Sequence, residues 1–119
     1  MKLLLVEDND RLRKMMKSLY TPGFDEVIEC SDGTEAVAAY LKDNPDWVVM
    51  DIRMKVMDGI EATSKIVSAD PGAKIIIVSQ FNDESTIAAA KHAGAIEFIS
   101  KENLSNVIEF INNYLRSAK

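Results

Sequence analysis

The fold class follows from one stretch of the chain, Trp47-Val48-Val49-Met50-Asp51. Four consecutive apolar residues are typical of a short strand buried on both faces, as in the interior of a parallel sheet covered by helices. The run then ends in a carboxylate. A side chain at the end of a buried strand is held by the sheet but open to solvent, and that is a suitable position for a reactive group.

Outward from this stretch, short apolar runs alternate with helical patterns. We expect five strands, at Lys2–Val6, Glu26–Cys30, Trp47–Asp51, 74–79 and Glu97–Ser100. The second is the most polar and is typical of an edge strand. Amphipathic stripes predict five helices, and the first stripe consists of Leu12, Met15, Met16 and Leu19. This order indicates an α/β fold, a doubly wound three-layer sandwich whose site lies beyond the carboxyl ends of the strands.

The length, charge and cysteine content of the chain exclude some classes of protein. A chain of 119 residues is the size of one domain, which we expect to span 1–119. A net charge of -5 argues against nucleic-acid binding, which needs clustered Lys and Arg. We expect neither a signal peptide nor a membrane span, because no apolar run approaches the ~20 residues required. The single cysteine, Cys30, fits a reducing cytosol.

Polar side chains follow four of the predicted strands. Glu7 and Asp8 follow the first, Asp51 ends the third, Ser79 ends the fourth, and Lys101 follows the fifth. Each residue alone is typical of a helix cap, a turn or a solvated surface. Together they put three acids, a hydroxyl and an amine on one edge of one sheet, which favours a functional site.

The chemistry of this group points to phosphoryl transfer. Clustered carboxylates repel one another unless a cation is present, and carboxylates with a carbonyl and waters suit Mg²⁺, with Mn²⁺ as an alternative. A divalent ion and a lysine together neutralise phosphoryl oxygens. The remaining carboxylate can then act as the nucleophile and form an acyl phosphate.

Four sequence motifs resemble those of a known family. They are Leu3-Leu4-Leu5-Val6-Glu7-Asp8-Asn9, the Asp51-x-x-Met54-x-x-x-Asp58-Gly59 spacing, Ile77-Val78-Ser79, and Gly94-Ala95-x-x-Phe98-x-x-Lys101. Over nearly its whole length the chain resembles response-regulator receiver domains. The resemblance implies a flavodoxin-like fold, in which a five-stranded parallel sheet of order 2-1-3-4-5 is combined with five helices.

The resemblance also implies a role for each site residue. Asp51 would accept a phosphoryl group from a histidine kinase or a phosphotransfer protein. Asp8 and Asp51 would bind Mg²⁺ directly, Glu7 mainly through water, and the Arg53 backbone carbonyl would complete the protein ligands. Ser79 and Lys101 would contact phosphate oxygens, and Ser79 and Phe98 would form the switch. The domain would then be a phosphoacceptor that assists its own phosphorylation and dephosphorylation rather than an enzyme.

The implied output is a changed surface. Phosphorylation would alter the face made by the fourth helix, the fifth strand and the fifth helix, and this face would control an output domain or a downstream protein, or a phosphorylation-dependent homodimer. We expect a cytoplasmic protein. Because the chain ends soon after the fifth helix, we expect either a stand-alone receiver or the front of a longer regulator.

The chain departs from the family pattern at three positions. Lys55 and Glu102 stand where proline is usual, so we expect a mobile loop at Lys55 and a trans Lys101–Glu102 bond. Gln80 replaces a smaller residue and could crowd the phosphate. Arg53 and Phe81 flank the site at positions that tune dephosphorylation in the family.

Three other functions remain open on the residues alone. A haloacid-dehalogenase-like phosphatase would need a second acid where this chain has Arg53. A flavodoxin-like cofactor module would need a phosphate-cradling loop where Glu7 and Asp8 stand. A receiver-like interaction module that is never phosphorylated is the third.

Overall fold

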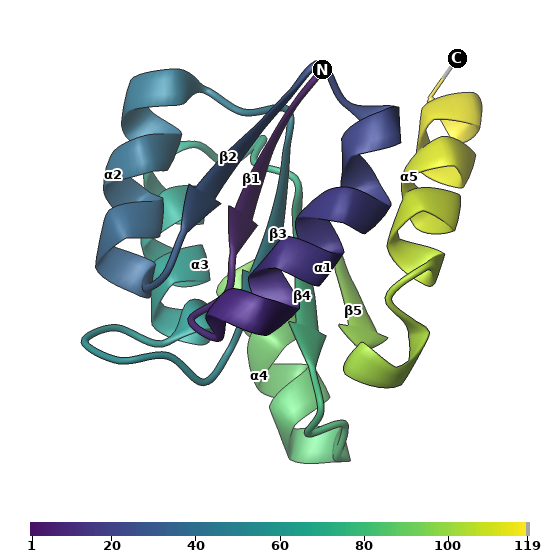
Figure 1. The fold of residues 1–119 in the computed structure, drawn as a ribbon. Coiled ribbons are helices and arrows are strands. Elements are labelled where there is room, and N and C mark those ends of the chain that lie inside the picture. Colours follow the sequence, from purple (N-terminus) through teal and green to yellow (C-terminus); the bar gives the residue numbers. More distant parts are fainter. Residues whose placement is uncertain (119) are drawn as a thin grey trace.

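The structure of the protein is a computed structural model that describes residues 1–118. Strands and helices alternate along the chain (Figure 1). The strands are β1 (Lys2–Val6), β2 (Glu26–Cys30), β3 (Trp47–Asp51), β4 (Ile75–Ser79) and β5 (Glu97–Ser100). The helices are α1 (Asp10–Tyr20), α2 (Gly33–Asp43), α3 (Gly59–Ala69), α4 (Glu84–Ala93) and α5 (Asn106–Ser117). Short 3₁₀ turns follow α1 at Thr21–Gly23 and β5 at Lys101–Asn103.

The strands form one parallel sheet of order β2-β1-β3-β4-β5, which confirms the expected fold and the edge position of β2. The order and the handedness of the crossovers decide which helix covers which face. The connection from β1 leads toward the β2 edge of the sheet, and the connections from β2, β3 and β4 lead toward the β5 edge. Because parallel connections are right-handed, α1 lies on one face and α2, α3 and α4 lie on the other. The last helix, α5, returns to the α1 face (Figure 1).

Alternating strand residues supply two separate cores. Leu4, Val48 and Ile77 face α2, α3 and α4, where Tyr40 and Ile66 are among the buried partners. On the other face Leu5, Val49 and Ile76 pack with Met16 and Tyr20 of α1 and Ile111 of α5. Because β3 and β4 are buried along their whole length, the sheet is a rigid base for whatever side chains stand at its carboxyl edge.

Four of the five helices begin at an Asn or Asp cap. Asn9, Asp32, Asp58 and Asp83 each accept a hydrogen bond from the backbone N–H three residues later. These bonds satisfy donors that a helix cannot pair internally. Each cap lies between two and seven residues past a strand end, so each of these loops at the carboxyl edge is anchored on both sides.

The first helix differs from the predicted stripe. Met16 and Tyr20 are buried and Leu12 is half-buried, whereas Met15 and Leu19 are 51% and 41% exposed. The sheet is therefore contacted by a ridge of residues spaced by four, which ends where the Tyr20 hydroxyl donates to the Leu104 carbonyl oxygen at 2.9 Å. The predicted stripe is therefore right for Leu12 and Met16 and wrong for Met15 and Leu19.

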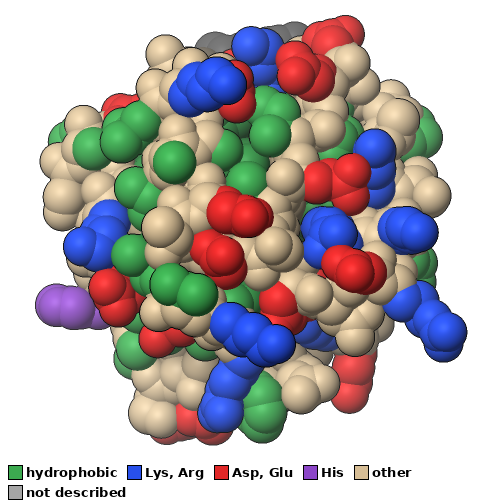
Figure 2. Space-filling view, turned by 60° about the vertical axis from the view of Figure 1, so that its left-hand side comes forward, with side chains coloured by type: hydrophobic (Ala, Val, Ile, Leu, Met, Phe, Trp, Pro, Cys, Tyr) green, Lys and Arg blue, Asp and Glu red, His purple; other side chains and the backbone are tan. Residues whose placement is uncertain are grey.

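On the face shown in Figure 2, Lys and Arg side chains are interspersed with Asp and Glu, with hydrophobic side chains between them. The positive charge on this face is thus spread out rather than concentrated in a stripe. Of the helices in residues 1–118, none combines the length and the apolarity that crossing a membrane would require.

Candidate functional site

The structure brings the five predicted strand-end residues to the same edge of the sheet. Val6 pairs with Met50, so Glu7 comes level with Asp51, and Asp51 pairs with Val78, one residue before Ser79. Ser79 pairs in turn with Ser100, directly before Lys101. Parallel strands end at a common edge, and this register fixes how far each side chain stands beyond it.

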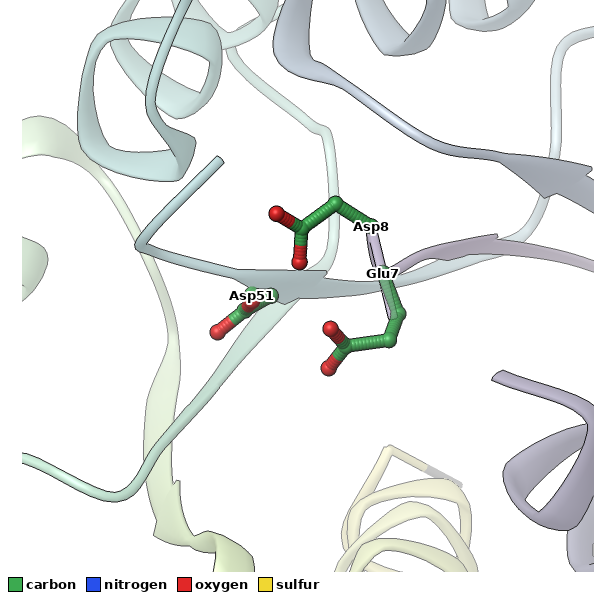
Figure 3. Close-up of side chains that lie close together, drawn as sticks. All are labelled: Glu7, Asp8 and Asp51. Atoms are coloured by element: carbon green, nitrogen blue, oxygen red, sulfur yellow. The ribbon is translucent and has the colours of Figure 1, made fainter. Parts of the chain in front are cut away.

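Three carboxylates gather at this edge. Glu7, Asp8 and Asp51 each offer an oxygen, and these oxygens lie within 4.8 Å of one another (Figure 3). Glu7 and Asp51 are buried, at 1% and 3% exposure, while Asp8 is open to solvent. Burial, followed by the hydrogen bond and the charge of Glu7, raises the pKa of Asp8 above its usual value. The negative charges of the cluster therefore repel one another and disfavour the fully ionised state.

Lys101 supplies the positive charge within the cluster. Its Nζ lies 2.9 Å from Glu7 Oε1 and 3.1 Å from Asp51 Oδ1, so one ammonium group joins two buried carboxylates. Burial lowers the pKa of Lys101, but the close contact with Glu7 and the charge of Asp51 outweigh it and the pKa is raised. Lys101 thus stays protonated at neutral pH.

The cluster fits a divalent cation. Three acids face one lysine, and Glu7 Oε1, although paired with the ammonium group, accepts no well-directed hydrogen bond from the described residues. Oxygen ligands with surplus negative charge are what Mg²⁺ prefers. Arg53 lines a cavity of about 440 Å³ together with Asp8, on the solvent side of the cluster.

The Ser79 hydroxyl can donate a hydrogen bond. Its side chain is buried, and its oxygen accepts a hydrogen bond from the Phe81 backbone N–H at 3.0 Å. That bond uses a lone pair and leaves the hydroxyl proton free for an acceptor nearby. Phe98 lies on the same face of the sheet, because it pairs with Ile77, two residues before Ser79. It is half-buried against the core under α2, α3 and α4.

The β3–α3 loop is strained beside the phosphoacceptor candidate. Val56 has a φ of 68° and is the centre of a γ-turn in which the Met57 N–H donates to the Lys55 carbonyl oxygen at 2.8 Å. A β-branched residue is disfavoured there. The first residue of α3 packs closely against the end of β3, since a methyl group at Gly59 would lie 1.8 Å from the Asp51 carbonyl oxygen. The Lys101–Glu102 peptide bond is trans, as expected.

One contact at the site was not predicted. The Arg53 guanidinium lies 4.2 Å from the centre of the Phe81 ring, a cation–π contact beside Ser79. These residues line a cavity of about 250 Å³ with Ser79. The sequence held a signal for this contact, because Arg53 stands two residues beyond the end of β3 and Phe81 stands two residues beyond the end of the adjacent strand β4. Equal offsets on neighbouring parallel strands bring side chains together.

Comparisons with known proteins place the chain in a family. The family model of the response regulator receiver domain matches residues 3–112. The chemotaxis protein CheY of Thermotoga maritima is 39% identical over 113 residues, which cover 93% of this chain and 94% of that protein. CheY of Bacillus subtilis is 39% identical over 116 residues, with coverage of 96% and 97%.

Solved structures show the same likeness. The chain of a CheX–CheY–BeF₃–Mg²⁺ complex from Borrelia burgdorferi has a TM-score of 0.89 at 30% identity, covering 97% of this chain and 89% of that chain. A LuxR-family response regulator from Aurantimonas has a TM-score of 0.88 at 28% identity, with coverage of 98% and 85%. The matches to the family and to its solved members therefore identify this chain as a member of the response regulator receiver domain family, the signalling domains of two-component systems.

Proposed function

We propose that residues 1–119 form one receiver domain that works as a phosphorylation-dependent switch, with Asp51 as the phosphoacceptor. The observation that carries the proposal is the Asp51 carboxylate itself. It is buried, it lies in an oxygen cluster with Glu7 and Asp8, and one oxygen is 3.1 Å from Lys101 Nζ. A structural aspartate at a turn has no need of such surroundings.

In the proposed reaction an Asp51 carboxylate oxygen attacks phosphorus, and the bond from phosphorus to the donor atom breaks as the leaving group departs with its electron pair. The product is an acyl phosphate. The donor would be phosphohistidine on a kinase or phosphotransfer protein, or a small acyl phosphate. Lys101 would hold one phosphoryl oxygen through its ammonium group, and Ser79 would donate its free hydroxyl proton to another.

Glu7, Asp8, Asp51 and the Arg53 carbonyl are the groups that would hold Mg²⁺, or Mn²⁺ in its place. When bound, the ion supplies neutralising charge to the oxygens of the transferred group. The excess of acids over cations in the cluster supports this assignment. The Borrelia relative, which was solved in a complex containing Mg²⁺, supports it independently.

The switch would pass through Ser79 and Phe98. When Ser79 moves toward a phosphoryl oxygen, it leaves space on the face of the sheet that Phe98 shares. Phe98 also lines a cavity of about 340 Å³ between β5 and α5, so it stands between the core and the α4-β5-α5 surface. Reversing a 1:99 population takes about 5.5 kcal/mol, and two or three charge-assisted hydrogen bonds of about 1.5–3 kcal/mol each are of that size.

The output would be read from the α4-β5-α5 surface by an output domain, a downstream protein or a second copy of the chain. The proposed compartment is the cytoplasm. The buried Cys30 thiol, whose pKa burial raises to about 11, would stay protonated and unreactive there.

Incubation with acetyl phosphate and Mg²⁺, followed by intact mass spectrometry, tests the proposal. We expect one phosphoryl group per chain, none without Mg²⁺, and none in Asp51→Asn. Asp58→Asn is the matched control, because it removes an acid from the same loop while asparagine still caps α3. Phosphate uptake by Asp51→Asn at the wild-type rate would show that the acceptor lies elsewhere. No uptake by the wild type would favour the unphosphorylated interaction module.

A further inference from the structure

The peptide unit between Glu7 and Asp8 joins the two acids that follow β1. Its carbonyl oxygen belongs to Glu7, so a bond to that oxygen restrains ψ of Glu7 and φ of Asp8, the two torsions that place one side chain relative to the other. In Figure 3 both carboxylates extend to the side where Asp51 lies. An uncompensated change in either torsion would move the Asp8 carboxylate relative to Glu7 and Asp51.

Arg13 of α1 holds that carbonyl oxygen. Its Nη1 donates to Glu7 O at 2.8 Å, and the Glu7 N–H donates to the Cys30 carbonyl oxygen of β2 at 3.1 Å. Both backbone polar groups of Glu7 are therefore engaged. The carboxylate is held as well, since Oε2 accepts from the Asn9 N–H at 3.1 Å. The Arg13 side chain is itself mostly covered, at 16% exposure.

The guanidinium is fixed at its other nitrogens. Nη2 donates to Asp10 at 2.8 Å and Nε to Glu29 of β2 at 3.3 Å. A planar group with three fixed donors cannot swing, so its bond to Glu7 has a defined direction. The two acids also offset the positive charge of Arg13 locally. The described contacts of Arg13 thus make it a brace between α1, β2 and the acid pair.

We propose that Arg13 is a positioning residue, whose bond to the Glu7 carbonyl oxygen holds the Glu7–Asp8 peptide as the cluster needs it and thereby sets the affinity for Mg²⁺. The inference rests on the proposed function. Arg13 acts through the residues that would hold the ion and is not itself one of them. Partners of this kind, one step behind the ligands, orient metal sites.

Two opposing effects make the inference testable. As a cation near the cluster, Arg13 opposes Mg²⁺ binding, so its loss would tighten binding if charge were all that mattered. As a brace it favours binding, so its loss would weaken it. Lys17→Gln is the matched control, because Lys17 has the same charge one turn further along α1, and its ion pair among the described residues is with the same Glu29, at 3.1 Å.

The experiment is calorimetric titration of the whole chain with MgCl₂, for wild type, Arg13→Gln, Arg13→Lys and Lys17→Gln. We expect Arg13→Gln to raise the Mg²⁺ Kd about tenfold, as loss of such partners does, and Lys17→Gln to leave it unchanged or slightly lower. Arg13→Lys keeps the charge and one donor, and should recover part of the loss. Melting temperatures without metal report any general loss of stability separately.

The outcomes separate cleanly. An Arg13→Gln chain that binds Mg²⁺ as tightly as Lys17→Gln overturns the inference, even if the wild type is phosphorylated normally. If Arg13→Gln does not fold by circular dichroism, Arg13→Lys decides, and wild-type affinity in that variant is the contrary result. A wild type that binds Mg²⁺ but takes up no phosphate overturns the proposed function and leaves the role of Arg13 standing. A wild type that binds no Mg²⁺ overturns both.

Discussion

Replacement of Lys101 by methionine tests the electrostatics of the cluster most directly. Methionine keeps an apolar stem of similar length and removes the charge that joins Glu7 and Asp51. At an effective dielectric of about 20, each contact near 3 Å has a gross energy of about 5 kcal/mol. Desolvation offsets much of this, and loss of one partner from a buried pair costs about 3–5 kcal/mol.

We expect the lower end of that range, about 3 kcal/mol at pH 7 without Mg²⁺, because the Lys101 side chain retains 18% exposure. An unfolding entropy of about 2.1 cal/mol/K per residue converts this into a fall in Tm of about 12 °C. The Lys101 pKa is raised in the fold. Its stabilisation is therefore complete below the ordinary lysine value of about 10.4 and is lost only as pH rises through the higher folded value.

Urea and thermal unfolding of the wild type and Lys101→Met, with and without Mg²⁺, provide the assay. The deficit should shrink when Mg²⁺ is added, because the ion supplies charge to the same carboxylates. Lys65→Met, which removes an exposed lysine of α3, should change stability by no more than about 0.5 kcal/mol. A loss below about 1 kcal/mol for Lys101→Met at pH 7 without Mg²⁺ would refute the reasoning.

Two further predictions concern the loops around the site. Val56→Gly should raise the free energy of unfolding by about 1 kcal/mol in urea titrations, because relief of a strained φ of 68° outweighs the entropy that glycine adds to the unfolded chain; a lower stability would contradict the strain. The hydroxyls of Ser85 and Thr86 hold the pKa of Asp83 at about 2, so its stabilisation of α4 is present above about pH 3.9 and lost as pH falls through 2. An NMR titration midpoint at or above 3.9 would contradict that arrangement.

The sheet and its site edge were predictable because they depend on order along the chain. Apolar runs such as Ile75–Val78 predict strands buried on both faces, and parallel strands with right-handed connections must end at one edge. Glu7, Asp51 and Lys101 are therefore brought together by topology, whatever their neighbours do. The caps at Asp32 and Asp58 likewise depend on residues only a few positions away.

The sequence by itself thus determined the fold class and the membership of the cluster, because periodicity and strand order are local or topological properties. Tertiary structure decided which groups touch. Lys101 bridges two acids, Arg13 braces the Glu7 carbonyl, Arg53 stacks on Phe81, and Met15 faces solvent. Each of these contacts depends on how a helix or loop sits against the sheet and on the rotamer that the space allows. Those are long-range packing outcomes, and a periodic pattern gives the apolar face of α1 without giving the line along which it meets the strands.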